Sequence, residues 1–256
     1  MKINSFNFLY LLEMLLPAIG LCLPLKKRQH GIQKALTVVL AGFLLSGLVT
    51  TFFISHFGTA IAENLSQPEQ FAGLIFWFFM TWTIVISAIY LYTESSIYDS
   101  IYIFALSYGI EHIFYCIRVL TECITNGVID NKHPVIYLPC LLGSFLLAYF
   151  WFTSGTIYEG RYPTGAIAAT TTSVVLIAIV CGLSIVMAFF GYAHLHSIYA
   201  LLCCIFILTN QRGQMKREIE RIEFSQKEQL WEKTKLRYEM SKESMAVVNQ
   251  HYHDMK

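Results

Sequence analysis

Charged side chains are scarce in this sequence: they make up 14% of its 256 residues, against 55% for hydrophobic ones. A soluble domain usually carries about 25% charged residues. The scarcity is confined to one part, because residues 1–210 hold 17 charged side chains (8 Lys/Arg and 9 Asp/Glu) and residues 211–256 hold 18 (10 and 8). This division predicts a membrane-embedded part over residues 1–210 and a cytoplasmic helical segment over residues 211–256.

Several chemical signatures are also missing. The seven cysteines are odd in number, include no Cys-x-x-Cys, and show no Cys/His spacing typical of zinc, so we expect no metal site. No P-loop and no Gly-rich nucleotide fingerprint occurs, which predicts no cofactor site within the chain. The net charge of +1 and the lack of a basic patch argue against a nucleic-acid partner.

Long apolar runs are what the sequence does have. A helix needs about 20 apolar residues to cross the hydrocarbon core of a bilayer. Runs of that kind occupy residues 6–25, 35–55, 71–92, 97–120, 134–152, 166–190 and 192–208. They predict an all-α fold, a polytopic membrane helix bundle of seven spans. Six spans is the rival count, because only a tight turn around Gly191 separates the last two runs.

Basic residues predict the orientation, since Lys and Arg gather in cytoplasmic loops. The first loop carries four and the segment after the last run carries four more: Lys26, Lys27, Arg28, Lys34, Arg212, Lys216, Arg217 and Arg221. Both segments are therefore expected in the cytoplasm, and the N-terminus outside. An outside start and an inside end require an odd number of crossings, which favours seven. We expect a multi-pass protein of the cell membrane, with the lipid bilayer as its solvent.

Aromatic and apolar residues recur every seven positions in the polar C-terminal segment. They are Phe224, Trp231, Tyr238, Met245 and Tyr252. A strict seven-residue repeat places one stripe against a partner helix in a left-handed coil. The pattern therefore predicts a coiled coil through which the chain forms a homodimer. The alternative is a single amphipathic helix that lies on the membrane or on the chain's own loops.

A His-Asp pair, His253 and Asp254, occurs near the end of the sequence and begins one residue past that stripe. Neighbouring helical residues differ by about 100° around the helix, which places His253 at the edge of the stripe, within reach of solvent. A carboxylate that hydrogen-bonds one imidazole nitrogen leaves the other nitrogen nucleophilic. A histidine that accepts a phosphoryl group needs this arrangement. The alternative is a surface pair without a chemical role.

The stretch Tyr252-His253-Asp254-Met255-Lys256 resembles the start of the H-box of GHKL-type sensor histidine kinases, a family that includes receptors for secreted peptides. Its members often have a polytopic sensor followed by a helical linker, an order that this whole chain loosely matches. By this resemblance His253 is the phosphoacceptor and Asp254 the acid that activates it. The resemblance also implies a response regulator as partner, an extracellular peptide as signal, and ATP and Mg for the full-length family member.

The sequence departs from the family in one respect. It stops inside the H-box, and the Asn-rich and Gly-rich elements that bind ATP and magnesium are absent from these residues. We therefore expect a truncated sensor portion. The family's enzyme activity is that of an ATP:protein-histidine phosphotransferase, and its catalytic ATPase domain would have to come from outside this sequence. Two other classes stay open: a small transporter or channel with an oligomerising cytoplasmic helix, and a membrane anchor that dimerises through its tail.

Ionisable residues inside the fourth apolar run form the other candidate site. Glu111, His112 and Arg118 lie there, and Glu111 and Arg118 are seven residues apart, so they share a helix face. Charges in hydrocarbon are costly and normally face the bundle interior or a wet cavity. The functional interpretation is a ligand pocket or ion path, with Glu13 of the first run beside it. The structural interpretation is that these charges only fix the packing of the spans.

Overall fold

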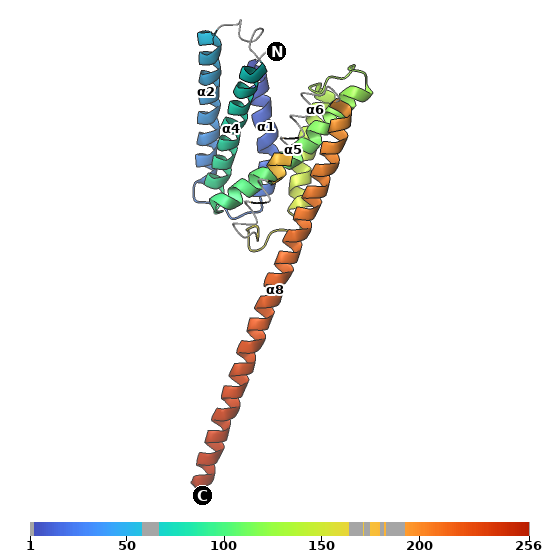
Figure 1. Cartoon of the computed structure of the whole chain (residues 1–256). Coiled ribbons are helices and arrows are strands. Elements are labelled where there is room, and N and C mark those ends of the chain that lie inside the picture. Colours follow the sequence, from blue (N-terminus) through green and yellow to red (C-terminus); the bar gives the residue numbers. More distant parts are fainter. Residues whose placement is uncertain are drawn as a thin grey trace.

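The computed structural model of the chain is mostly helical in the part that it describes (Figure 1), namely residues 3–57, 67–163, 171, 175–179, 182 and 193–255. Its elements are α1 (Ile3–Cys22), α2 (Gly31–Phe57), α4 (Gln67–Tyr92), α5 (Ile97–Ile124), α6 (Pro134–Leu146), the π-helix η1 (Leu147–Phe152) and α8 (Ala193–Asp254). The described residues contain no β-strand, so the all-α fold class is confirmed for them.

The helices follow the predicted apolar runs. α1, α2, α4 and α5 each coincide with one of the first four runs, α6 and η1 together with the fifth, and the beginning of α8 with the last. The run at 166–190 and the turn at Gly191 lie largely outside the described residues. The choice between six and seven spans therefore stays a prediction.

Two helices within the described residues are long and apolar enough to cross a membrane. They are Ile97–Ile124, with 28 residues, and Pro134–Phe152, with 19. Shorter apolar stretches lie in α1, α2 and α4, at Leu9–Cys22, Gly31–Leu45 and Phe78–Tyr92. By length and composition this agrees with association with a membrane, while the number of crossings stays a prediction.

Helix α5 is the centre of the bundle. It packs against α1, α4, α6 and α8, and its side chains from Tyr102 to Ile113 are all buried. The helix begins at a capping box, in which the Ser96 hydroxyl accepts from the Asp99 amide and the Asp99 carboxylate accepts from the Ser96 amide. Its stretch from Tyr102 to Ile110 is apolar on nearly every side of the helix, a pattern typical of an enclosed helix.

Close packing of α1 on α6 and η1 depends on Gly20. A Cβ atom at this position would lie 3.0 Å from Ala148 Cβ and 3.0 Å from the Phe145 carbonyl oxygen. Glycine therefore lets the two helix backbones approach each other. This approach brings the middle of α1 next to the faces of α5 and α6 that carry polar side chains.

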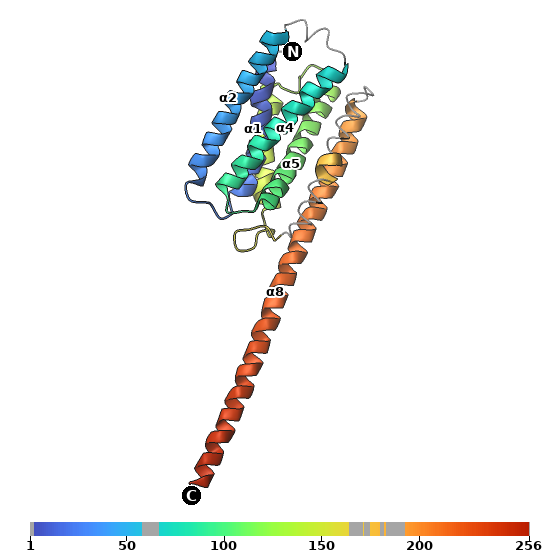
Figure 2. The same ribbon diagram turned by 60° about the vertical axis from the view of Figure 1, so that its left-hand side comes forward.

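Three loops meet at one end of the bundle. The Lys26 amide donates to the Gly160 carbonyl at 3.0 Å, the Glu94 amide to the Lys26 carbonyl at 2.9 Å, and the Arg28 amide to the Tyr92 carbonyl at 3.0 Å. The loops after α1, α4 and η1 are thus joined backbone to backbone, and α8 leaves the bundle at this same end (Figures 1 and 2).

Helix α8 runs for 62 residues without a break. Its first part packs along α5 through a buried stripe made of Ser197, Ala200, Cys204, Leu208 and Met215. Its second part projects beyond the bundle as a straight rod, and the C-terminus lies at its far end (Figure 2).

Candidate functional site

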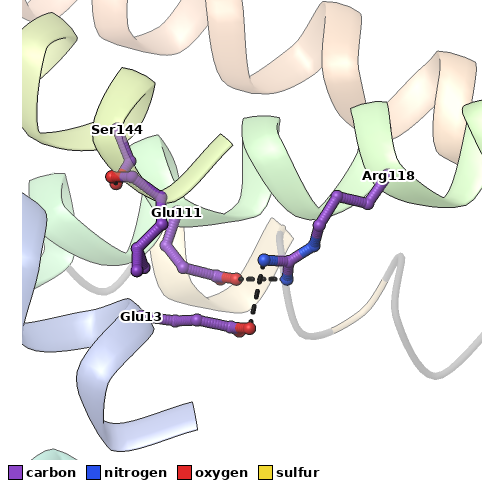
Figure 3. A network of polar contacts seen from close by, with 5 residues as sticks. Glu13, Glu111, Arg118 and Ser144 are labelled. Carbon is purple, nitrogen blue, oxygen red and sulfur yellow. Dashed lines mark hydrogen bonds and ion pairs between the residues drawn. The ribbon is translucent and has the colours of Figure 1, made fainter. Parts of the chain in front are cut away.

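A cluster of buried charges lies between α1, α5 and α6 (Figure 3). Arg118 Nη1 is 3.0 Å from Glu13 Oε1, and Arg118 Nη2 is 3.6 Å from Glu111 Oε1. The side chains of Arg118, Glu13 and Glu111 are only 6%, 12% and 6% exposed. One guanidinium therefore holds two carboxyl groups from different helices. We call Glu13, Glu111 and Arg118 the polar cluster.

Helix geometry explains two of these positions. Glu111 and Arg118 are seven residues apart on α5, and two turns of an α-helix bring them to the same face. Both side chains point towards α1, where Glu13 reaches the other end of the guanidinium (Figure 3). An Arg side chain is suited to this bridge, because its planar fork presents donors to two acceptors at once.

Aromatic rings cover the other sides of the guanidinium. The Arg118 Cζ atom lies 5.1 Å from the Tyr137 ring centroid on α6 and 5.8 Å from the Tyr115 ring centroid on α5. A cation near a ring face is attracted by the ring quadrupole, more strongly where water is excluded. The rings help to hold Arg118 away from solvent.

A small cavity of about 10 Å³ borders the polar cluster, roughly the space that one water molecule needs. Its walls are formed by Glu13, Glu111, Phe114, Arg118, Cys140, Leu141 and Ser144. The Ser144 hydroxyl donates to the Leu141 carbonyl at 2.8 Å, and its oxygen keeps acceptor capacity. The cavity therefore adjoins polar groups from α1, α5 and α6, and its volume is about that needed by one water molecule.

His112 does not belong to the ion pairs, although the sequence suggested it together with Glu111 and Arg118. It is buried, with its ring centroid 6.2 Å from that of Tyr108 and 5.6 Å from that of Tyr115. Its Nε2 has no hydrogen-bond partner among the described residues. Adjacent helical residues diverge by about 100°, which explains why His112 and Glu111 have different neighbours.

Sequence reasoning missed the contribution of α6. Tyr137, Cys140 and Ser144 are buried and approach the polar cluster or its cavity. Their spacing of three and four residues marks one helix face. That stripe of small and polar side chains in an apolar run was the available signal.

A second contact region joins the bundle to α8 at the loop-rich end. The Arg212 guanidinium lies 4.9 Å from the Trp151 ring centroid, and its Nη2 donates to the Ser154 carbonyl at 3.3 Å. Further along, the Tyr158 hydroxyl donates to Gln226 Oε1 at 2.9 Å. We call residues 153–163 the clasp loop, because they hold α8 where it leaves the bundle.

The clasp loop is itself fixed to the bundle. The Tyr162 hydroxyl donates to the Leu21 carbonyl at 3.1 Å, and the Tyr162 ring is buried. Burial raises the pKa of Tyr162 well above its ordinary range, so the hydroxyl stays protonated and remains a donor. From α5, the Tyr102 hydroxyl adds a hydrogen bond of 3.1 Å to Gln211 Oε1.

The candidate phosphoacceptor lies far from both regions. His253 and Asp254 are exposed in the last turn of α8, at the end of the rod away from the bundle (Figure 1).

The heptad residues from Phe224 to Tyr252 are exposed as well. A second exposed apolar stripe follows Leu236, Met240 and Val247. The rod thus carries exposed apolar surface of the kind that marks interaction with another protein or with a membrane.

The described residues contain no group of three His, Cys, Asp or Glu side chains placed to hold a metal ion. Comparison with known proteins found no matching family model, no matching curated protein and no matching solved structure.

Proposed function

We propose that this chain is the membrane sensor and linker portion of a sensor histidine kinase, and that its helix α8 carries the phosphoacceptor His253 with Asp254 as the activating acid. The observation that carries this proposal is the continuity of α8. One unbroken helix of 62 residues packs on the central helix α5 at its beginning and ends at Asp254. A rigid helix of this kind transmits a rotation or shift from the bundle to the imidazole.

Exposed apolar surface supports placing the bundle in a bilayer. Residues spaced by four form an exposed stripe along α2, at Ile32, Leu36, Leu40, Leu44 and Leu48. α6 and the first part of α8 expose similar residues, at Val135, Leu138, Leu142, Leu146, Ile198, Tyr199, Leu202 and Phe206. Contiguous apolar surface of this extent is unfavourable in water and favourable against lipid.

The loop contacts support a cytoplasmic rod and an outside N-terminus. The basic loop at 26–28 hydrogen-bonds to residues 92–94 and to Gly160, and the clasp loop binds Arg212. All these segments therefore lie at one end of the bundle, with the basic residues that mark a cytoplasmic side. The clasp loop lies at this end, whereas α8 begins at the opposite end of the bundle (Figure 1). We propose that residues 166–190 make the return crossing, giving seven spans.

Signalling in this proposal passes through two linked contacts. A signal at the outer side, for which the family resemblance suggests a peptide, shifts α1, α5 and α6 relative to one another at the polar cluster. The clasp loop and Tyr102 pass that shift to α8, because they contact it at Gln211, Arg212 and Gln226. The rod then changes how His253 meets the ATP-binding domain, which uses ATP and Mg and lies outside these residues. A response regulator receives the phosphoryl group.

A phosphotransfer assay tests the proposal. The ATP-binding half of a GHKL kinase is fused after Lys256, and the membranes are incubated with ATP labelled at the γ-phosphate. We expect acid-labile label on the chain and its loss in His253→Gln. His251→Gln is the matched control, because His251 is also exposed in the last turn of α8. Label that persists in His253→Gln, or disappears in His251→Gln alone, contradicts the assignment.

The polar cluster favours a second candidate, a small transporter or channel. Buried ionisable groups beside a water-sized cavity occur along proton and ion pathways. Liposomes that contain the chain and a pH-sensitive dye separate the two candidates. Proton flux above that of empty liposomes, lost in Glu111→Gln, supports transport. Absence of flux together with labelling of His253 supports the sensor.

A further inference from the structure

The formal charges of the polar cluster do not balance. Glu13 and Glu111 carry one negative charge each when ionised, and Arg118 carries one positive charge. The exposures of 12%, 6% and 6% leave little contact with solvent that could screen the excess. An uncompensated buried charge is strongly unfavourable, and a buried acidic group escapes the cost by taking up a proton.

No neighbouring group among the described residues supplies the missing positive charge. The titratable side chains around the cluster are Tyr115 and Cys116 on α5, Tyr137 and Cys140 on α6, and Cys204 on α8. Phenols and thiols are neutral or negative, so none of them can offset a carboxylate. His112 packs between Tyr108 and Tyr115 and makes no ion pair with the carboxyl groups.

The guanidinium that the two acids share indicates where a proton resides. The carboxyl groups of Glu13 and Glu111 contact the two Nη atoms of the same Arg118 side chain, at 3.0 Å and 3.6 Å, so two negative charges would lie side by side. An ionised carboxylate has acceptor oxygens only, so two of them cannot form a hydrogen bond with each other. One proton between them provides the donor, and it also reduces the charge of the cluster to zero.

We propose that the polar cluster binds one proton, which Glu13 and Glu111 share as a carboxylic acid–carboxylate pair that Arg118 holds in place. The adjoining cavity, lined by Ser144, has room for one water molecule beside the pair. In the neutral cluster, α1 is tied to α5 both by the guanidinium and by the shared proton. Loss of the proton leaves two negative groups in contact and weakens that tie. The proposal is independent of the kinase assignment, since it concerns only the charge state of the bundle.

Infrared spectroscopy of the purified full chain in lipid vesicles tests the proposal directly. A protonated carboxyl group has a carbonyl stretch distinct from that of a carboxylate, and the band shifts in deuterated water. At neutral pH we expect one such group per chain. Glu13→Gln and Glu111→Gln should each remove the band, because the remaining carboxylate then pairs with Arg118 and stays ionised. Glu94→Gln is the matched control, since Glu94 is exposed at the end of the bundle, and it should keep the band.

Replacing the cation gives the opposite result. In Arg118→Met both acids lack a counter-charge, so both should remain protonated and the band should double in intensity. Absence of the band in the wild-type chain at neutral pH would overturn the proposal, as would a band that both glutamine variants leave unchanged. The two glutamine variants test the shared proton even if Arg118→Met does not fold. Each of them retains one carboxylate that can pair with Arg118.

Discussion

The Tyr158 hydroxyl donates a hydrogen bond to Gln226 Oε1 at 2.9 Å, although 68 residues separate the two in the chain. Gln226 lies about three helical turns beyond Met215, the last buried side chain that α8 presents to the bundle. The clasp loop therefore extends the hold of the bundle on the rod past the point where core packing ends.

Tyr158→Phe should loosen this stretch of α8. The substitution keeps the ring and removes one partly exposed hydrogen bond, which contributes about 1 kcal/mol or less. We expect amide hydrogen exchange around Gln226 to become up to about fivefold faster, with little change in overall stability. Tyr98→Phe is the control, because Tyr98 is an exposed tyrosine at the start of α5. Equal exchange rates in wild type and Tyr158→Phe would show that the bond does not hold the rod.

Arg212→Ala should have a larger effect on the same helix. It removes both the contact with the Trp151 ring and the hydrogen bond to the Ser154 carbonyl. A cation–π contact and a hydrogen bond from a charged donor together contribute about 1–3 kcal/mol, so amides near Arg212 should exchange roughly tenfold faster. In the control, Arg217→Ala, an exposed Arg is lost from the neighbouring turn. If Arg217→Ala accelerates amide exchange as much as Arg212→Ala does, the effect comes from the loss of positive charge on the helix and not from the contacts with Trp151 and Ser154.

Features of this structure that depend on residues close together in the sequence could be predicted, whereas contacts between segments far apart in the sequence could not. Apolar runs, the Ser96–Asp99 capping box and Pro134 at a helix start are local signals, and they place α5 and α6 within a few residues. The all-α class follows from the same runs. The pairing of Glu111 with Arg118 also follows locally, from a spacing of two helical turns.

Specific contacts between distant segments do not follow from the sequence alone. Charge in an apolar run suggested that Glu13 lies beside the site on α5, but Glu13 and Arg118 are 105 positions apart, and nothing in either run indicates that these two side chains form the ion pair. Trp151 and Arg212 are separated by a segment that connects η1 with α8, so their contact depends on the helix arrangement. His112, which the sequence assigns to the same polar site as Glu111 and Arg118, packs between Tyr108 and Tyr115 and not in the ion pairs, because adjacent residues of a helix point in different directions.

Gly20→Val should disrupt the packing of α1 on α6. The new side chain would meet Ala148 Cβ and the Phe145 carbonyl at about the limit of contact, so the helices must separate. Overpacking of this kind typically costs about 1–3 kcal/mol. Gly47→Val is the matched control, since among the described residues no other helix and no side chain lies within 4 Å of a Cβ built there. Thermal unfolding in detergent should show a lower midpoint for Gly20→Val alone; a comparable loss in Gly47→Val would indicate a general effect of valine at these glycines.

Self-association of the rod should depend on its aromatic stripe. The double variant Trp231→Lys and Tyr238→Lys places charges in the apolar interface of the predicted coiled coil. Cross-linking between copies of the chain should therefore fall several-fold. Gln229→Lys adds a charge at another exposed position and should leave cross-linking unchanged. Unchanged cross-linking in the double variant would show that the stripe does not mediate contact between copies.

The side of the membrane that the rod occupies decides whether the bundle can signal to His253 inside the cell. The most direct measurement is labelling of single cysteines by a membrane-impermeant maleimide on intact cells, in a chain whose native cysteines are replaced. Val128→Cys, in the exposed loop after α5, should react from outside, whereas Gln29→Cys and Ser244→Cys should react only after lysis. Labelling of Ser244→Cys on intact cells would contradict a cytoplasmic rod, and with it the proposed function.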